Sequence, residues 1–168
     1  MRRISSPRVR PLSAVLLLVA AAMLSALAAL GSGAGASARC ATRGPLPDPL
    51  CTPGAIFSGA SSRQICRAGY SRSVRDVPDA LKRRTYYAYG IRRHPRGSFE
   101  IDHLIPLELG GSNAPSNLWP EAAPGFRRKD RLENALHDAV CSGRVDLRAA
   151  QREIARNWYA TWLRAGRP

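Results

Sequence analysis

The 168-residue chain predicts an α+β fold that has few strands and several helices. Residues 99–104 form a short apolar-rich run that is typical of a strand. Residues 78–89, 129–141 and 147–164 carry apolar side chains three and four positions apart, which indicates amphipathic helices. Four cysteines and many turn residues outside these segments predict loops that need covalent support.

The first 38 residues have the order of a secretory signal peptide. Four arginines precede an apolar run over residues 12–30, and small residues follow, ending in Ala36-Ser37-Ala38. This A-x-A ending favours cleavage after Ala38 over the alternative, a retained membrane anchor. We therefore expect a secreted, extracytoplasmic protein that has no stable membrane association after cleavage.

The chain after Ala38 is strongly basic. Residues 1–38 hold four of the 26 basic residues and none of the 12 acidic ones, so residues 39–168 carry a formal charge of +10. Such a charge favours a polyanionic partner, which is nucleic acid, anionic lipid or a wall polymer. Ordinary surface charge that keeps the protein soluble is the alternative explanation.

All four cysteines follow the predicted cleavage site. An even count in an exported chain predicts two disulfides, and three pairings are possible. Zinc binding is the competing interpretation, but the chain contains no Cys-x-x-Cys pair. The residues concerned are Cys40, Cys51, Cys66 and Cys141.

Residues 39–77 are predicted to form a loop-rich, disulfide-linked arm of the domain. Residues 39–48 are rich in Pro and Gly, and the Cys51-Thr52-Pro53-Gly54 string predicts a turn. We expect short strands in this arm, among them residues 55–57.

The helix predicted over residues 78–89 carries much of the positive charge. Pro78 suits the first turn of a helix, and Gly90 suits its end. One interpretation is that these basic residues bind a phosphate backbone while the two interleaved tyrosines stack on bases. The alternative is an ordinary solvated helix face. The basic residues are Lys82, Arg83, Arg84, Arg92, Arg93 and Arg96.

Residues 99–119 hold the residues best suited to chemistry. Alternation along the predicted strand places Asp102 and His103 on opposite faces. Residues 107–109 are expected to resume the strand briefly, and residues 110–113 (GGSN) predict a turn. Asn117 is expected in a second polar loop, and residues 120–125 in another loop.

Two helices are predicted after this stretch. The first covers residues 126–141, with its approach. The second runs from Leu147 to about Arg164, with Asp146 as its N-cap. One face of this last helix is predicted to be core, formed by Leu147, Ala150, Ile154, Trp158 and Trp162.

The order of these motifs resembles the HNH, or ββα-metal, nucleases. The matching elements are Asp102-His103, Gly110-Gly111, Asn117-Leu118 and the helix from about Lys129. The chain is most similar to small secreted bacterial members that carry DHLIPLELGG and NLWPE strings, a KD-x-x-E-N helix, and upstream CTPGA and VR segments. The resemblance covers most of the chain after residue 50. It implies a small ββα-metal core with flanking helices within residues 78–168.

The resemblance also implies catalytic roles. His103 would be the general base, since an uncharged His accepts a proton near neutral pH. Asn117 would hold the loop and help to orient His103, with Asn113 as a rival for that role. Asp102 and one helix residue would hold one divalent metal ion, Mg²⁺ before Mn²⁺ or Zn²⁺, because a carboxylate is a hard oxygen ligand.

The metal ligand from the helix is the least determined residue. Asp130 stands nearest the place that the resemblance implies, and Glu133, Asn134 and His137 are alternatives on the same broad face. Three flanking arginines are expected to hold substrate phosphates. They are Arg127, Arg128 and Arg131.

The sequence therefore predicts a secreted, metal-dependent endonuclease that acts on nucleic acid, with DNA favoured over RNA. One alternative is a non-catalytic cationic protein that binds nucleic acid or another polyanion. The other is a metal-dependent hydrolase of a different phosphoester. The sequence gives no indication of the oligomeric state.

Overall fold

A two-stranded antiparallel hairpin lies at the centre of the computed structural model, which describes residues 40–168. Strand β1 (Phe99–His103) pairs with β2 (Leu118–Ala122), with His103 opposite Leu118 and Ile101 opposite Pro120. The strand predicted at residues 99–104 is confirmed. The loop predicted over residues 120–125 is wrong for residues 120–122, which belong to β2. The second strand was not predicted because it contains Pro120, and a proline within a segment argues against a strand. A proline is tolerated in β2 because this strand has β1 as its one partner, so one of its edges needs no N–H donor.

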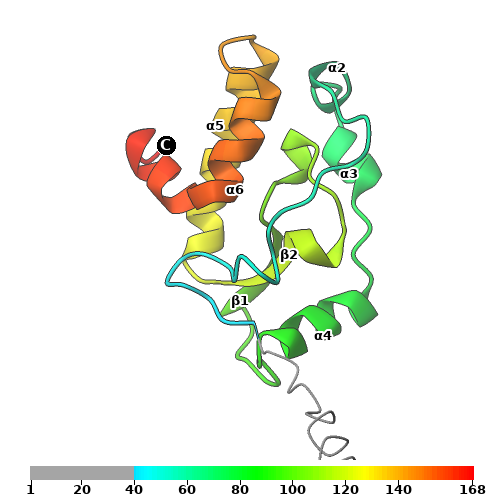
Figure 1. Cartoon of the computed structure of the whole chain (residues 1–168), viewed down its shortest axis with the longest axis vertical. Coiled ribbons are helices and arrows are strands. Elements are labelled where there is room, and N and C mark those ends of the chain that lie inside the picture. The colour runs from blue at the N-terminus through cyan, green and yellow to red at the C-terminus, as the bar shows by residue number, and fades with distance from the viewer. Residues whose placement is uncertain (1–39) are drawn as a thin grey trace, which may run out of the picture. The chain divides into compact units, whose positions relative to one another are not determined.

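Different helices cover the two faces of the hairpin. Trp119 of β2 packs into the main core with Leu132 of α5 (Gly125–Cys141) and Ile154 of α6 (Leu147–Arg164). Leu118 points to the other face, towards α4 (Asp79–Ala88). Figure 1 shows α5 and α6 side by side above the hairpin, and α4 beneath it. All three helices occur where the sequence predicts them.

Helix α6 has the predicted bounds and one feature that was not predicted. The side chain of Asp146 accepts a hydrogen bond from the Ala149 N–H at 2.9 Å, as an N-cap does. At Asn157 the backbone leaves helical geometry, and the Asn157 side chain accepts from the Ala160 N–H at 2.9 Å. Asn157 therefore caps a second helical segment after a kink.

The core confirms the predicted inner face of α6. Side chains from β2, α5, α6 and the β1–β2 connection form one cluster, and residues 39–168 form one compact unit. The predicted α6 residues in it are Leu147, Ala150, Ile154, Trp158 and Trp162, each at most 7% exposed.

The arm before α4 contains two short helices where strands were expected. These are α2 (Ser62–Ile65) and α3 (Tyr70–Val74), and the predicted strand at residues 55–57 is reduced to one β-bridge between Ile56 and Gly111. Only Ile65 of the two helices is buried. These segments have few apolar side chains that a sheet could bury. Their backbone groups therefore form hydrogen bonds with near neighbours in the chain, as in a helix.

Two disulfides link this arm, as the cysteine count predicts. Cys40 bonds to Cys51, and Cys66 at the end of α2 bonds to Cys141 at the end of α5. No described cysteine is free. The alternative of zinc bound by cysteine thiolates is therefore excluded for the oxidised protein.

The connection from β1 to β2 holds two 3₁₀ helices, η2 (Leu107–Leu109) and η3 (Pro115–Asn117). The prediction that residues 107–109 resume a strand is wrong, because this backbone bonds to itself: the Leu109 N–H donates to the Pro106 carbonyl at 3.0 Å and the Gly110 N–H to the Leu107 carbonyl at 2.8 Å. The chain then passes Gly111, where a Cβ would lie 1.7 Å from the Ile105 carbonyl oxygen. Only glycine allows the backbone to approach itself so closely.

The predicted signal peptide lies outside the described residues. Within residues 40–168, no helix has both the length and the hydropathy that crossing a membrane requires.

Candidate active site

His103 ends β1, and its ring is held by a chain of hydrogen bonds. His103 Nε2 lies 3.0 Å from Asn113 Oδ1, and Asn113 Nδ2 donates to the Val74 carbonyl at 2.7 Å. A carbonyl can only accept, so the Asn113 NH₂ group must face Val74 and its oxygen must face His103. His103 therefore donates from Nε2, and its Nδ1 keeps a lone pair.

The environment of His103 keeps it uncharged. The side chain is 2% exposed, and this burial, with the nearby Arg75 guanidinium, lowers the pKa of His103. Nδ1 forms no hydrogen bond with a described residue, yet it is not among the atoms sealed from solvent. A neutral imidazole with a free lone pair that solvent reaches is suited to accept a proton.

Asn117 holds the loop and does not contact the His103 ring. Its amide donates to the carbonyls of Ile105 and Ser112 at 2.9 and 2.8 Å and accepts from the Ile105 N–H at 2.9 Å. The residue is fully buried. Of the two asparagines that the sequence left open, Asn113 is thus the one that orients the His103 ring.

Asp102 lies on the other face of β1, against a buried lysine. Lys129 Nζ, from α5, is 2.9 Å from Asp102 Oδ2 and donates to the His103 carbonyl at 2.6 Å. The same ammonium pairs with Glu133, one turn along α5. Lys129 is 0% exposed, so these three contacts replace all of its water. We call Asp102, Glu121, Lys129 and Glu133 the buried carboxylate–lysine cluster.

Asp102 and Lys129 are the charged pair of this cluster, since burial raises the pKa of Glu133 to about 8. Burial alone would lower the pKa of Lys129, but Asp102 and Glu133 raise it above its ordinary value. Burial opposes ionisation of Asp102, yet Lys129 holds the pKa of Asp102 below its usual range.

Glu121 belongs to the cluster as a neutral acid. It is 1% exposed, and no described residue forms a hydrogen bond with either carboxyl oxygen. Burial, and then the Asp102 carboxylate beside it, raise the pKa of Glu121 to about 11. Its side chain also lies against the start of α5, where a Cβ at Gly125 would be 2.8 Å from Glu121 Oε1.

These residues do not fit a resident divalent ion shared by Asp102 and Asp130. One Asp102 oxygen accepts from the His103 N–H at 2.7 Å, and the other contacts Lys129. A metal bound to the same carboxylate would be repelled by the adjacent ammonium. The Asp130 side chain reaches the surface of α5. Partial desolvation, and then the nearby Asp102 carboxylate, raise the pKa of Asp130. Among the described residues, no third His, Cys, Asp or Glu side chain gathers with these two.

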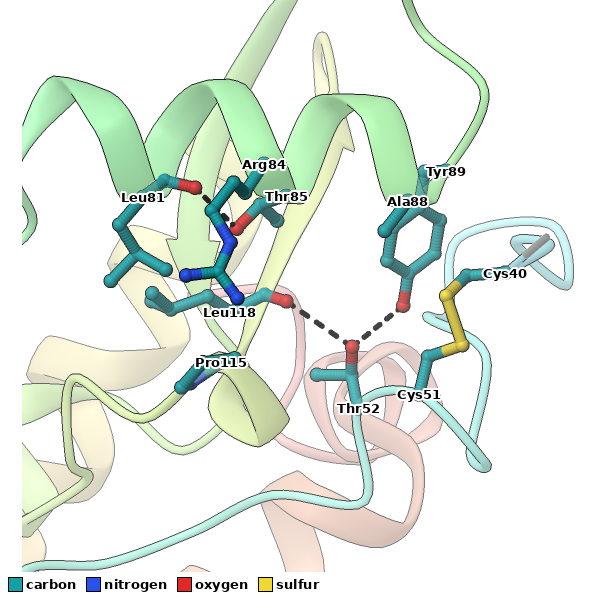
Figure 2. Close-up of a pocket in the computed structure, with 10 residues that line it drawn as sticks. All are labelled: Cys40, Cys51, Thr52, Leu81, Arg84, Thr85, Ala88, Tyr89, Pro115 and Leu118. Carbon is teal, nitrogen blue, oxygen red and sulfur yellow. Dashed lines mark hydrogen bonds between the residues drawn. A yellow bond between two sulfur atoms is a disulfide. The ribbon is translucent and has the colours of Figure 1, made fainter. Parts of the chain in front are cut away.

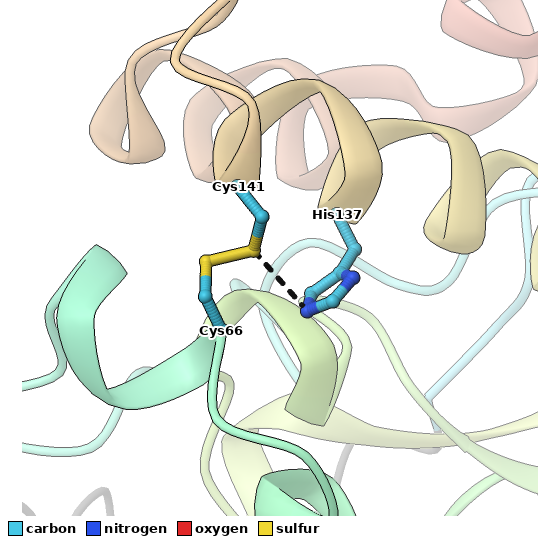
Figure 3. A group of neighbouring side chains, drawn as sticks. All are labelled: Cys66, His137 and Cys141. Carbon is cyan, nitrogen blue, oxygen red and sulfur yellow. Dashed lines mark hydrogen bonds between the residues drawn. A yellow bond between two sulfur atoms is a disulfide. The ribbon is translucent and has the colours of Figure 1, made fainter.

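A different group of possible ligands lies at the far end of α5. Figure 3 shows His137 beside the Cys66–Cys141 disulfide, with His137 Nε2 3.4 Å from Cys141 Sγ. Metal binding needs thiolates, and both sulfurs are bonded to each other. This group is therefore a disulfide with an adjacent histidine, and His137 does not join the His103 site.

The three arginines expected to bind phosphate point elsewhere. Arg127 and Arg131 are two residues from Lys129, about 200° around the helix, and so lie on the opposite side of α5. Arg128 stacks over the Trp162 ring at 5.4 Å, and Arg131 Nε donates to the Pro168 carbonyl at 2.7 Å. The structure does not bring them to His103.

Sequence reasoning missed three residues of the site. Arg75 is a cation close enough to lower the pKa of His103, and it also lowers the pKa of Asp130 and Glu100 against the effect of their burial. Lys129 and Glu121 form the cluster behind Asp102. Signals existed for two of them: the Val74-Arg75 string precedes α4, and Lys129 and Glu133 stand at the i, i+4 spacing of a helical ion pair.

Comparison of the chain with protein-family models, with curated proteins and with solved structures gives no significant match.

Proposed function

We propose that this protein is a secreted, HNH-like endonuclease that hydrolyses phosphodiester bonds of nucleic acid, with His103 as the general base. The observation that carries the proposal is the hydrogen-bond chain from Val74 through Asn113 to His103 Nε2. It leaves Nδ1 free to take a proton. The succession of β1, β2 and α5 around His103 supports the expected ββα arrangement.

The chemistry follows from the placement of these groups. His103 Nδ1 takes a proton from water as the water oxygen bonds to phosphorus. The bond from phosphorus to the leaving oxygen breaks, and that oxygen takes a proton from solvent. Arg75 supplies positive charge beside the phosphate, where negative charge develops in the transition state.

A divalent ion is the cofactor that the resemblance implies. The contacts of Asp102 do not fit such an ion, because both carboxylate oxygens already have partners. Asp102 instead pairs with Lys129, which holds the end of β1.

Secretion remains part of the proposal. The signal-peptide pattern motivates it, and the two disulfides suit an oxidising compartment.

The test is turnover of plasmid DNA and of RNA by the mature protein and by His103→Ala. We expect a loss on the order of 100-fold or more, the usual scale for a missing general base. Activity should also fall as pH drops through the pKa of His103, which burial places below the ordinary value of 6.5. His94→Ala is the matched control, because His94 is exposed in a loop outside the site. Full activity of His103→Ala would overturn the mechanism.

A non-catalytic cationic binding protein is the second candidate. The observation in its favour is that Arg83 and Arg93 are exposed and have no acidic partner among the described residues. Under this alternative, His103→Ala and the wild type bind nucleic acid equally and neither cleaves it.

A further inference from the structure

A cavity of about 320 Å³ lies between α4, the Cys40–Cys51 loop and the start of β2 (Figure 2). Leu81 and Ala88 of α4 form one wall, and Pro115 and Leu118 form the opposite wall. Its size is at the lower end of the roughly 300–1,000 Å³ that is typical of small-molecule sites. Its lining is mostly apolar, which suits a flat ring placed between the two walls.

The cavity opens on the same face of the hairpin as His103, although His103 does not line it. Leu118 is the register partner of His103, and paired residues of an antiparallel ladder project from the same face. Pro115 is two residues from Asn113, which holds the His103 ring. A group bound in the cavity therefore lies on the same face of the hairpin as His103, with Leu118 between the cavity and the base.

Arg84 supplies charge to this otherwise apolar cavity. In Figure 2 its side chain extends from α4 towards Leu118 and Pro115. Its guanidinium has no ion pair and no hydrogen bond with a described residue. An unpaired guanidinium is suited to bind a phosphate through two parallel hydrogen bonds.

The end wall is rigid. Thr52 Oγ1 donates to the Leu118 carbonyl at 3.2 Å, and the Tyr89 hydroxyl lies 2.6 Å from Thr52 Oγ1. The Cys40–Cys51 disulfide closes the same end. The cavity is thus largely formed before a ligand arrives.

We propose that this cavity binds one nucleotide unit of the substrate, with the base between the apolar walls and a phosphate on Arg84. The proposal rests on the proposed function, because the occupant is part of the nucleic acid that His103 would cleave. A nucleotide fits better than an uncharged apolar ligand, because Arg84 and the adjacent basic residues of α4 attract an anion.

The direct test is binding of deoxyadenosine 5′-monophosphate to the mature protein, followed by NMR or calorimetry. Arg84→Gln removes the charge, and Ala88→Trp fills the cavity from an exposed position. We expect each to weaken binding at least tenfold. Arg63→Gln and Ala80→Trp are the matched controls, because both residues are exposed outside the cavity. Equal affinity in all four variants would overturn the proposal.

Two further measurements separate the possible outcomes. Inorganic phosphate should bind more weakly than the nucleotide. Equal affinity would show that the nucleobase does not contribute to binding in the cavity. With DNA as substrate, Arg84→Gln and Ala88→Trp should raise KM more than they lower kcat. If the wild type cleaves no phosphodiester, the proposed function fails, but the nucleotide-binding measurement still decides on the cavity.

Discussion

Lys129 is the residue that joins the two faces of the site. Its ammonium contacts Asp102 and the carbonyl of His103 itself, and it also pairs with Glu133. It is fully buried, and its contact with His103 is to the backbone carbonyl and not to the ring. The sequence predicted a metal ion as the positive charge beside Asp102. In the structure this positive charge is the Lys129 ammonium.

Lys129→Met should destabilise the protein by about 3–5 kcal/mol, the usual cost of leaving one member of a buried ion pair alone. The double variant Asp102→Asn with Lys129→Met should recover much of this loss, because neither member of the pair is then an isolated buried charge. Burial raises the pKa of Glu133, the other partner of Lys129, to about 8, so Glu133 is neutral at pH 7. Urea unfolding measures both. A single variant as stable as the wild type would contradict the contacts seen for Lys129.

The Cys66–Cys141 disulfide is the element-scale constraint on the site. It ties the end of α2 to the end of α5, the helix that carries Lys129. Its sequence separation is 75 residues, against 11 for Cys40–Cys51. In the chain-entropy model, a longer closed loop restricts the unfolded chain more.

Replacing Cys66 and Cys141 together by Ala should cost about 4 kcal/mol, and replacing Cys40 and Cys51 together about 3 kcal/mol. The free energy of unfolding in denaturant, measured without reductant, compares the two variants. The reverse order of stability would show that native contacts, and not loop closure, dominate the effect.

At the scale of the whole molecule, positive charge gathers on and after α4. The exposed residues Arg83, Arg93 and Arg96 lie there, and none has an acidic partner among the described residues. The predicted arginines of α5 do not join them, since Arg128 and Arg131 contact Trp162 and Pro168. Nucleic acid is therefore expected to approach from the side of α4, where the cavity also lies.

Changing Arg83, Arg93 and Arg96 together to Gln should weaken binding to all sequences alike. The salt slope should fall by about three, one for each lost phosphate contact. Fluorescence anisotropy with labelled DNA over a series of salt concentrations measures this. The control changes Arg144, Arg152 and Arg156, three arginines far from α4 in the sequence. An equal loss in both variants would assign the effect to net charge and not to a surface.

Local patterns were enough to predict much of the architecture. The apolar spacing of α6 and the Asp146 cap gave its bounds, and the even cysteine count predicted two disulfides. His103 stood out because an Asp-His pair, a glycine turn and an Asn-Leu pair occur together. Residue type, count and order along the chain are enough to recognise these features, so they can be predicted before the tertiary structure is known.

Contacts between distant segments decided the rest. The strand at Pro120 exists because β1 lies beside it, and Asn113 rather than Asn117 orients the base because Val74 comes within reach. The burial of Lys129 against Asp102 arises because folding brings α5 beside β1. A sequence pattern records periodicity along the chain, whereas burial and the pairing of buried charges depend on which segments meet in space.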